Sequence, residues 1–167
     1  MYLYYMGMTL EVDLTKLGDW AISAEMFEWI TTNIPHNSII LELGSGFGSV
    51  ELSKLYKVYS IEHDLEWIGL SDQVNYIHAP LVDNWYDESV LLKELPQKYD
   101  LLIVDGPIQE KRVNLLNHLD LFNFNIPIII DDTNRDLDYE MSMVISEKYN
   151  KEMVMFESDN KSFTVLR

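Results

Sequence analysis

The segment from Glu42 to Ser49, which reads Glu-Leu-Gly-Ser-Gly-Phe-Gly-Ser, constrains this chain most. It follows an apolar run at 38–41 that predicts a buried strand, and it leads into residues 50–55, which predict a helix. A glycine-rich turn between a strand and a helix N-terminus presents backbone N–H groups to a nucleotide-like ligand. Glycine permits the sharp turn and lets a ligand approach where a Cβ would collide. The segment therefore predicts an α/β fold with a nucleotide-type site.

An acidic residue lies at the matching distance. Glu62 closes a second apolar run, at 58–61, eighteen residues after Gly44. A carboxylate about 20 residues beyond the glycines is the expected partner of ribose hydroxyls, because its two oxygens can accept a hydrogen bond from each. The glycine turn alone is a weak pattern, and the strand, the helix and the acid together strengthen it.

Length and composition favour one folded domain. The 167 residues suffice for one hydrophobic core, so we take residues 1–167 as a single domain in which 1–19, without a clear period, form an N-terminal arm or lid. The apolar fraction of 47% excludes a disordered chain. No apolar run approaches the roughly 18 residues that span a bilayer, and no secretory leader opens the chain. With cysteine absent, these features favour a cytoplasmic protein without a membrane partner.

The charge narrows the choice of partner. The formal net charge is −16, and the first 53 residues contain one basic residue against seven acids. This field repels phosphate backbones, so we expect no nucleic-acid partner and favour a small or neutral substrate.

Strand and helix patterns alternate along the chain. Apolar runs predict strands at 38–43, 57–61, 74–78, 100–104 and 126–130. Ser23 is the expected N-cap of a helix that runs to about Asn33, and further helices are predicted at 47–56, 64–70, 87–95, 111–120 and 137–149. Continuous apolar runs are typical of parallel strands buried on both faces. The runs at 153–156 and 163–166 are too close for a crossover helix and predict an antiparallel hairpin. The predicted fold is a doubly wound, Rossmann-like α/β sheet, mostly parallel, with a C-terminal antiparallel hairpin.

The residues that follow the predicted strands carry the candidate chemistry. Ligands of open α/β sheets bind beyond the carboxyl ends of the strands, so these segments should meet at one rim. They are Gly44-Ser45-Gly46, Glu62-His63-Asp64, His78-Ala79-Pro80, Asp105-Gly106-Pro107 and Asp131-Asp132.

Together these segments make the sequence resemble the class I S-adenosylmethionine (SAM)-dependent methyltransferases, in particular small-molecule and sugar O-methyltransferase-like proteins. The resemblance covers about 20–135. It includes Leu-Glu-Leu-Gly-Ser-Gly at 41–46, Ile-Glu-His-Asp at 61–64, Val-Asp-Gly-Pro at 104–107 and Ile-Asp-Asp at 130–132. The closing hairpin also matches that fold. The resemblance implies methyl transfer from SAM to a hydroxyl oxygen of a small metabolite or sugar.

The resemblance also implies a SAM site. Gly44 and Gly46 would let the backbone approach the methionine part of SAM, and Glu42 would hold its ammonium. Glu62 would bind both ribose hydroxyls. The full implied cofactor set is Glu42, Gly44, Ser45, Gly46, Glu62, His63, His78, Ala79 and Asp105, with His78 or Ala79 beside the adenine. Trp20 and Ser23 precede the core, near where family members receive the SAM carboxylate.

Two catalytic alternatives stay open. In catechol-type relatives, an acid after the fourth strand and an acid pair after the fifth bind a divalent cation, and Asp105, Asp131 and Asp132 occupy the matching positions. Oxygen ligands suit Mg²⁺, which would lower the pKa of the acceptor hydroxyl and orient it. Without a metal, Asp105 or Asp132 is the expected general base, ahead of His78 or His63.

Other residues keep two interpretations each. Arg112 and Arg135 would bind an acidic substrate group or form ordinary ion pairs, and Trp85 and Tyr86 would line an acceptor pocket or the core. Two other functions compete, an NAD-type oxidoreductase and a non-catalytic SAM-fold subunit. The closing hairpin, and a serine at position 49 in place of a third spaced glycine, argue against the oxidoreductase. Homo-oligomerisation stays open.

Overall fold

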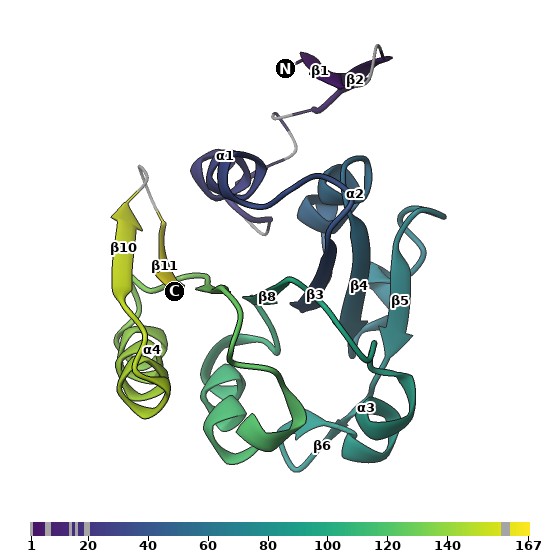
Figure 1. Ribbon diagram of the computed structural model, residues 1–167. Coiled ribbons are helices and arrows are strands. Elements are labelled where there is room, and N and C mark those ends of the chain that lie inside the picture. Colours follow the sequence, from purple (N-terminus) through teal and green to yellow (C-terminus); the bar gives the residue numbers. More distant parts are fainter. Residues whose placement is uncertain (1, 6–7, 14, 16, 19–20, 158–160) are drawn as a thin grey trace.

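A seven-stranded sheet organises the chain (Figure 1). The computed structural model describes residues 2–5, 8–13, 15, 17–18, 21–157 and 161–167. The strand order is β10-β11-β9-β8-β3-β4-β5. The strands are β3 (Ile39–Leu43), β4 (Lys57–Glu62), β5 (Asn75–His78), β8 (Leu101–Val104), β9 (Ile128–Ile130), β10 (Met153–Glu157) and β11 (Ser162–Leu166). All neighbours from β9 to β5 pair in parallel, whereas β11 runs antiparallel to both β9 and β10. The predicted sheet and its closing hairpin are confirmed.

The order in which the strands are added creates a switch point between β3 and β8. From β3 the chain adds β4 and then β5 on one side, and it returns to the other side of β3 to add β8 and β9. Strand order therefore reverses beside β3. Ligands of doubly wound sheets bind at the carboxyl ends of the strands at this kind of position.

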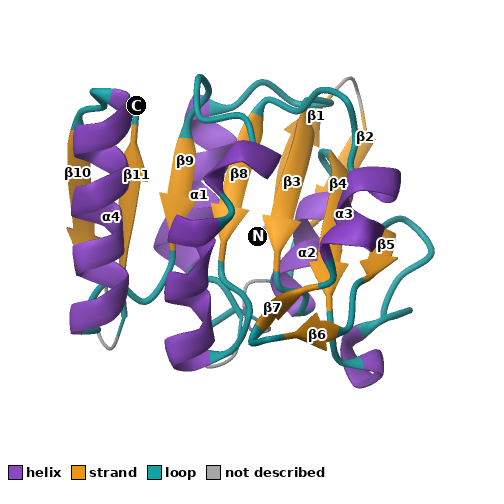
Figure 2. Cartoon of the chain, turned by 90° about the horizontal axis from the view of Figure 1, so that it is seen from below, coloured by secondary structure: helices purple, strands orange, loops and turns teal. Residues whose placement is uncertain are grey.

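Helices cover both faces of the sheet. The helices α1 (Ala24–Asn33) and α2 (Phe47–Ser53) lie on one face, and α3 (Glu88–Glu94) and α4 (Asp136–Tyr149) lie on the other. Figure 2 shows α3 and α4 in front of the sheet and α1 and α2 behind it. The Ser23 hydroxyl accepts the Met26 N–H (3.1 Å) and caps α1, at the predicted position.

Two apolar clusters, one on each face, explain the continuous hydrophobic runs. Leu41 and Leu43 pack into the cluster under α3 and α4, and Ile40 packs into the one under α1 and α2. Alternate residues of one strand point to opposite faces. A strand covered on both sides therefore has apolar residues at successive positions, as all four residues of β8 show.

Two predicted α-helices are wrong. Residues 64–70 form only the 3₁₀ turn η2 (Leu65–Trp67), because Leu65 is exposed and Gly69 adopts φ +84°, so the segment has no apolar face to bury. The predicted helix at 111–120 consists of the 3₁₀ helices η3 (Gln109–Asn117) and η4 (Leu119–Leu121). Residues three apart lie on the same side of a 3₁₀ helix, which places both Arg112 and Leu115 inside the protein.

Two hairpins escaped the sequence prediction. Strands β6 (Leu81–Val82) and β7 (Trp85–Tyr86) pair through Asp83 and Asn84, both with positive φ. Asp and Asn tolerate this left-handed conformation and favour tight hairpin turns, so the dipeptide was a usable signal. Strands β1 (Tyr2–Tyr5) and β2 (Met8–Glu11) form the other hairpin, within the predicted arm.

The described part of the N-terminal segment is attached to the second apolar cluster. Val12 is buried there, and the Asp13 N–H donates to the Glu51 carboxylate on α2 (2.9 Å). Trp20, a predicted contact of the cofactor, lies outside the described residues. No helix in the described part of the chain is long and apolar enough to cross a membrane.

Gly44 and Gly69 share a left-handed backbone conformation, but only Gly44 is also closely packed against another backbone segment. Gly44 and Gly69 adopt φ +93° and +84°, but a Cβ on Gly44 would lie 2.9 Å from the Gly106 nitrogen, whereas one on Gly69 would meet nothing within 4 Å. Each substitution to alanine costs about 1–2 kcal/mol of left-handed strain. Only Gly44→Ala adds a backbone collision. We expect Gly44→Ala to lower the free energy of unfolding clearly more than Gly69→Ala, measured by urea denaturation. Equal losses would contradict the close approach.

Candidate functional site

A pocket of about 180 Å³ lies beyond the carboxyl ends of the strands at the switch point. Parallel pairing of β3 with both β4 and β8 brings their C-terminal residues together there. Of the predicted site residues, Gly44, Ser45, Glu62, His63, Asp105 and Asp132 line the pocket. It is also lined by Asp64, Trp67, Tyr86, Gly106, Pro107, Ile108, Arg112, Arg135 and Lys161. Glu42, Gly46, His78, Ala79 and Asp131 are not part of this lining.

Glu62 links the glycine turn to the end of β4. Its Oε2 accepts the Ser45 N–H (2.9 Å), and its Oε1 accepts the N–H groups of His63 (2.6 Å) and Asp64 (2.8 Å). The His63 Nδ1 lies 2.7 Å from the same Oε1. Since a carboxylate oxygen has two lone pairs, Oε2 can accept a further hydrogen bond from a ligand in the pocket.

Glu42 lies under the turn rather than in the pocket. It is 2% exposed, and its Oε2 accepts the hydroxyls of Ser49 on α2 (2.5 Å) and Ser60 on β4 (3.0 Å). The Ser49 hydroxyl in turn accepts the Gly46 N–H (3.1 Å). Burial raises the pKa of Glu42 to about 8. The Glu42 carboxyl therefore supports the glycine turn through Ser49 and stays protonated near neutral pH. Its role toward an ammonium stays a prediction.

His78 and Ala79 lie beside Glu62 at the end of β5. His78 pairs with Glu62 in the parallel register, and the Ala79 N–H donates to the Glu62 carbonyl (2.9 Å). His78 is exposed, whereas Ala79 is fully buried. Their place beside an adenine stays a prediction.

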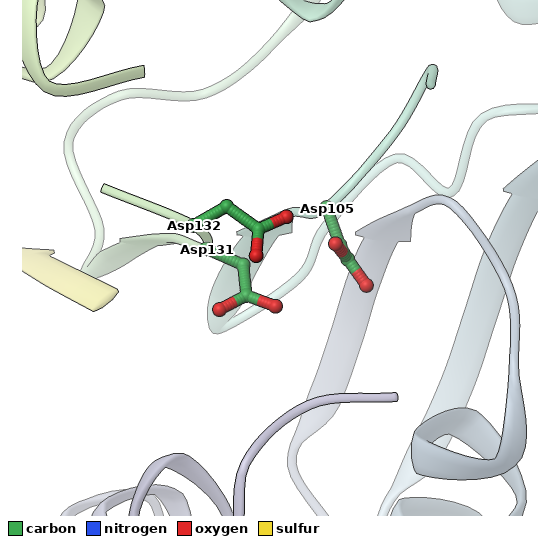
Figure 3. Close-up of side chains that lie close together, drawn as sticks. All are labelled: Asp105, Asp131 and Asp132. Carbon is green, nitrogen blue, oxygen red and sulfur yellow. The ribbon is translucent and has the colours of Figure 1, made fainter. Parts of the chain in front are cut away.

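Three predicted acids converge from neighbouring strands. Asp105 follows β8, and Asp131 and Asp132 follow β9; Figure 3 shows their carboxylates grouped at these strand ends. One oxygen from each lies within 4.8 Å of the others. The Asp131 N–H donates to the Val104 carbonyl (3.0 Å), which fixes the relation between the two strand ends.

Three cations lie among these acids in the described part of the chain. Arg112 is 3% exposed, and its Nη2 lies 3.2 Å from Asp105 and 3.3 Å from Asp132. Arg135 Nη1 lies 3.1 Å from Asp132, and Lys161 Nζ lies 3.4 Å from Asp131 and 3.8 Å from Asp132. Each of the three carboxylates thus has a cationic partner.

Burial and these ion pairs together set the direction in which the pKa values of the acids shift. Burial raises the pKa of Asp131 to about 7, with Asp105 adding to the rise and Lys161 opposing it. Burial also raises the pKa of Asp105, against the Arg112 charge. The three acids have the spacing of a metal site, but their charge is already balanced by neighbouring side chains. This donor set does not fit the Mg²⁺ that the resemblance implies.

Sequence reasoning left Arg112, Arg135 and Tyr86 undecided and did not consider Lys161. Arg112 had kept two interpretations, binding of an acidic substrate group or an ordinary ion pair, and its buried position follows from the 3₁₀ geometry of η3. Lys161 reaches Asp131 because β11 pairs antiparallel with β9. Tyr86, from the unpredicted hairpin, is 1% exposed and lines the pocket, and its hydroxyl has no hydrogen-bond partner among the described residues. Burial raises its pKa well above the ordinary value.

The pKa of Glu42 gives a test by stability. The folded state holds this proton more tightly than the unfolded state. The contribution of Glu42 to the free energy of unfolding therefore falls as pH rises from the ordinary glutamate pKa toward about 8. Each pKa unit is worth about 1.4 kcal/mol. Glu42→Gln cannot ionise and lacks this fall, so its stability relative to the parent should increase between about pH 5 and about pH 8 in urea denaturation. A constant difference would contradict the raised pKa.

Comparisons with known proteins support the fold. No protein-family model and no curated protein matches the chain. Among solved structures, cofactor-bound Rv0187 from MTB is similar with a TM-score of 0.66 and 14% identity, over 87% of this chain and 80% of that one. The O-methyltransferase TomG from Streptomyces achromogenes, determined in complex with SAM, is similar with a TM-score of 0.62 and 15% identity, over 91% and 83%.

A third structure adds a different substrate class. Precorrin-6y C5,15-methyltransferase from Geobacter metallireducens is similar with a TM-score of 0.60 and 14% identity, over 90% of this chain and 91% of that one. Identities this low show the fold alone. The chain has the class I methyltransferase fold, as its resemblance predicted.

Proposed function

We propose that this protein binds SAM and transfers its methyl group to a hydroxyl oxygen of a small metabolite or sugar. The observation that carries the proposal is Glu62, a pocket carboxylate hydrogen-bonded to the glycine turn at the switch point of a methyltransferase fold. Two of the similar structures, the O-methyltransferase TomG and precorrin-6y C5,15-methyltransferase, are methyltransferases by name.

The pocket contains groups suited to the ribose of SAM and to the place where its methyl group would meet the acceptor. Glu62 can accept ribose hydroxyls while its backbone partners keep it in place. Gly44 lines the pocket, and because it has no Cβ its turn can lie against the backbone of Gly106. The neighbouring Asp105 lies within the same pocket, where donor and acceptor would meet.

The chain's own contribution to the reaction is alignment and proton transfer. SAM supplies an electrophilic methyl group, so that a carbon–oxygen bond to the acceptor forms as the carbon–sulfur bond breaks. Asp105 or Asp132, both in the pocket lining, would take the acceptor hydroxyl proton as general base. Holding the two reactants in line and removing water from them would supply most of the rate.

Ligand binding and product formation test the proposal together. We expect SAM and S-adenosylhomocysteine to raise the melting temperature of the protein, and incubation of SAM with hydroxylated acceptors to produce S-adenosylhomocysteine. Stabilisation by NAD alone would overturn the proposal in favour of an oxidoreductase. SAM binding without product, across a broad panel of acceptors, would favour a non-catalytic SAM-binding subunit.

Glu62 should decide the affinity for SAM. Charged hydrogen bonds contribute about 1.5–3 kcal/mol each, so Glu62→Ala should raise the SAM dissociation constant at least about tenfold, measured by isothermal titration calorimetry. The exposed Glu66, on the neighbouring 3₁₀ turn, provides the control. Glu66→Ala should leave the affinity unchanged. Unchanged affinity in a folded Glu62→Ala protein would reject the ribose role.

Removing the Tyr86 hydroxyl tests whether it serves ligand binding rather than stability. Since this buried hydroxyl has no partner in the described residues, Tyr86→Phe should not lower the melting temperature of the ligand-free protein, but it should weaken SAM binding. Tyr99→Phe is the matched control, because the Tyr99 hydroxyl accepts the Asn123 N–H (2.6 Å). That variant should lose stability and keep its affinity for SAM. The reverse pattern would exclude Tyr86 from the ligand site.

A further inference from the structure

The guanidinium of Arg112 lies against Asp105 and Asp132, two of the three acids at the positions where catechol-type relatives bind a divalent cation. Its Nη1 donates to the carbonyl of Asp131 (3.0 Å), and its Nη2 donates to the carbonyl of Asp105. The same group lies within 3.2–3.4 Å of the side chains of Asp105, Asp132 and Asp138. Arg112 therefore bridges the carboxyl ends of β8 and β9 through both backbone and side-chain acceptors.

Arg112 is held in this position. It is 3% exposed, and it projects from the 3₁₀ helix η3, which packs against α4. Two of its acceptors are backbone carbonyls at strand ends, which cannot move away as a side chain could. A guanidinium is always charged in proteins and presents its donors in a planar fork. It therefore supplies a permanent, directional positive charge between Asp105 and Asp132.

A divalent cation at the three acids would meet this charge at close range. Mg²⁺ binds its oxygen ligands at about 2.0–2.1 Å, whereas the carboxylates of Asp105 and Asp132 lie within 3.3 Å of Arg112. Like charges at such short range repel each other strongly away from bulk water, and a divalent ion doubles the repulsion that a single charge would meet. Lys161 and Arg135 add further repulsion at Asp131 and Asp132.

We propose that Arg112 is the resident cation of this site and takes the place of a divalent metal, so that methyl transfer here requires none. The inference rests on the proposed function for its catalytic part. Arg112 acts as a positioning residue: it keeps the carboxylates of Asp105 and Asp132 side by side at the pocket, where either can take the acceptor proton. The charge that a metal would bring is already built into the chain.

Metal binding can be measured on the full chain before any acceptor is known. Mn²⁺, which favours the same oxygen ligands, is titrated with the protein and its free concentration is followed by electron paramagnetic resonance. We expect no binding by the parent protein up to millimolar Mn²⁺. We also expect SAM affinity by calorimetry to be the same with EDTA and with MgCl₂.

Removing the guanidinium should create the metal site. Arg112→Gln leaves the acids without their central charge and should bind Mn²⁺ at least about tenfold more tightly than the parent does. Arg112→Lys restores a positive charge and should not gain binding. Arg135→Gln is the matched control, because it removes an exposed cation from Asp132 while the Arg112 guanidinium stays in place. It should gain clearly less Mn²⁺ binding than Arg112→Gln.

Two results would overturn the inference. One is submillimolar Mn²⁺ binding by the parent protein that Asp131→Asn abolishes, because the acids would then hold a metal despite Arg112. The other is Mn²⁺ binding by folded Arg112→Lys as tight as by Arg112→Gln. Losing one partner of a buried ion pair is strongly destabilising, so Arg112→Gln can fail to fold, and the parent measurement then still tests the inference. Failure of SAM to bind would instead reject the proposed function.

Discussion

The close approach of two turns, at Gly44 after β3 and at Gly106 after β8, is the constraint on which the site depends. The N–H groups of Asp105 and Gly106 both donate to the Leu43 carbonyl (2.9 and 2.6 Å), and a Cβ on either glycine would collide with the backbone of the other turn. Because the two strand ends meet in this way, the glycine turn and the Asp105 carboxylate share one pocket. Glu62, at the end of β4, contacts the same glycine turn by accepting the Ser45 N–H.

Charge compensation is the second organising principle of this rim. The chain as a whole is strongly acidic, and the rim concentrates acids at the ends of neighbouring strands. Buried carboxylates are stable only when they are paired or protonated. Glu42 shows the second solution, since burial raises the pKa of its carboxyl to about 8, while Asp105 and Asp132 show the first through Arg112. The pocket thus contains Asp105 and Asp132, whose charge Arg112 balances, beside Glu62, whose Oε2 can accept a further hydrogen bond.

Elements that leave a local pattern in the sequence could be predicted, whereas elements that depend on contacts between distant residues could not. The parallel strands could be predicted because burial on both faces leaves a local trace, a run of apolar residues such as 101–104. The hairpin of β6 and β7 left only the Asp83-Asn84 turn as a signal. The segment at 109–121 forms 3₁₀ helices, and their spacing of three residues per turn brings Arg112 to carbonyls at two strand ends.

The sequence by itself determined the class of the fold, the glycine turn, the acids that follow the strands and the closing hairpin, since each depends on residues close together in the chain. Only the tertiary structure decided how those acids are used. Arg112 comes from η3 and Lys161 directly precedes β11, and both reach the acids by the packing of the fold rather than by sequence proximity. A pattern of carboxylates specifies where negative charge gathers. Whether a metal or a guanidinium balances it depends on which distant side chain the fold brings there.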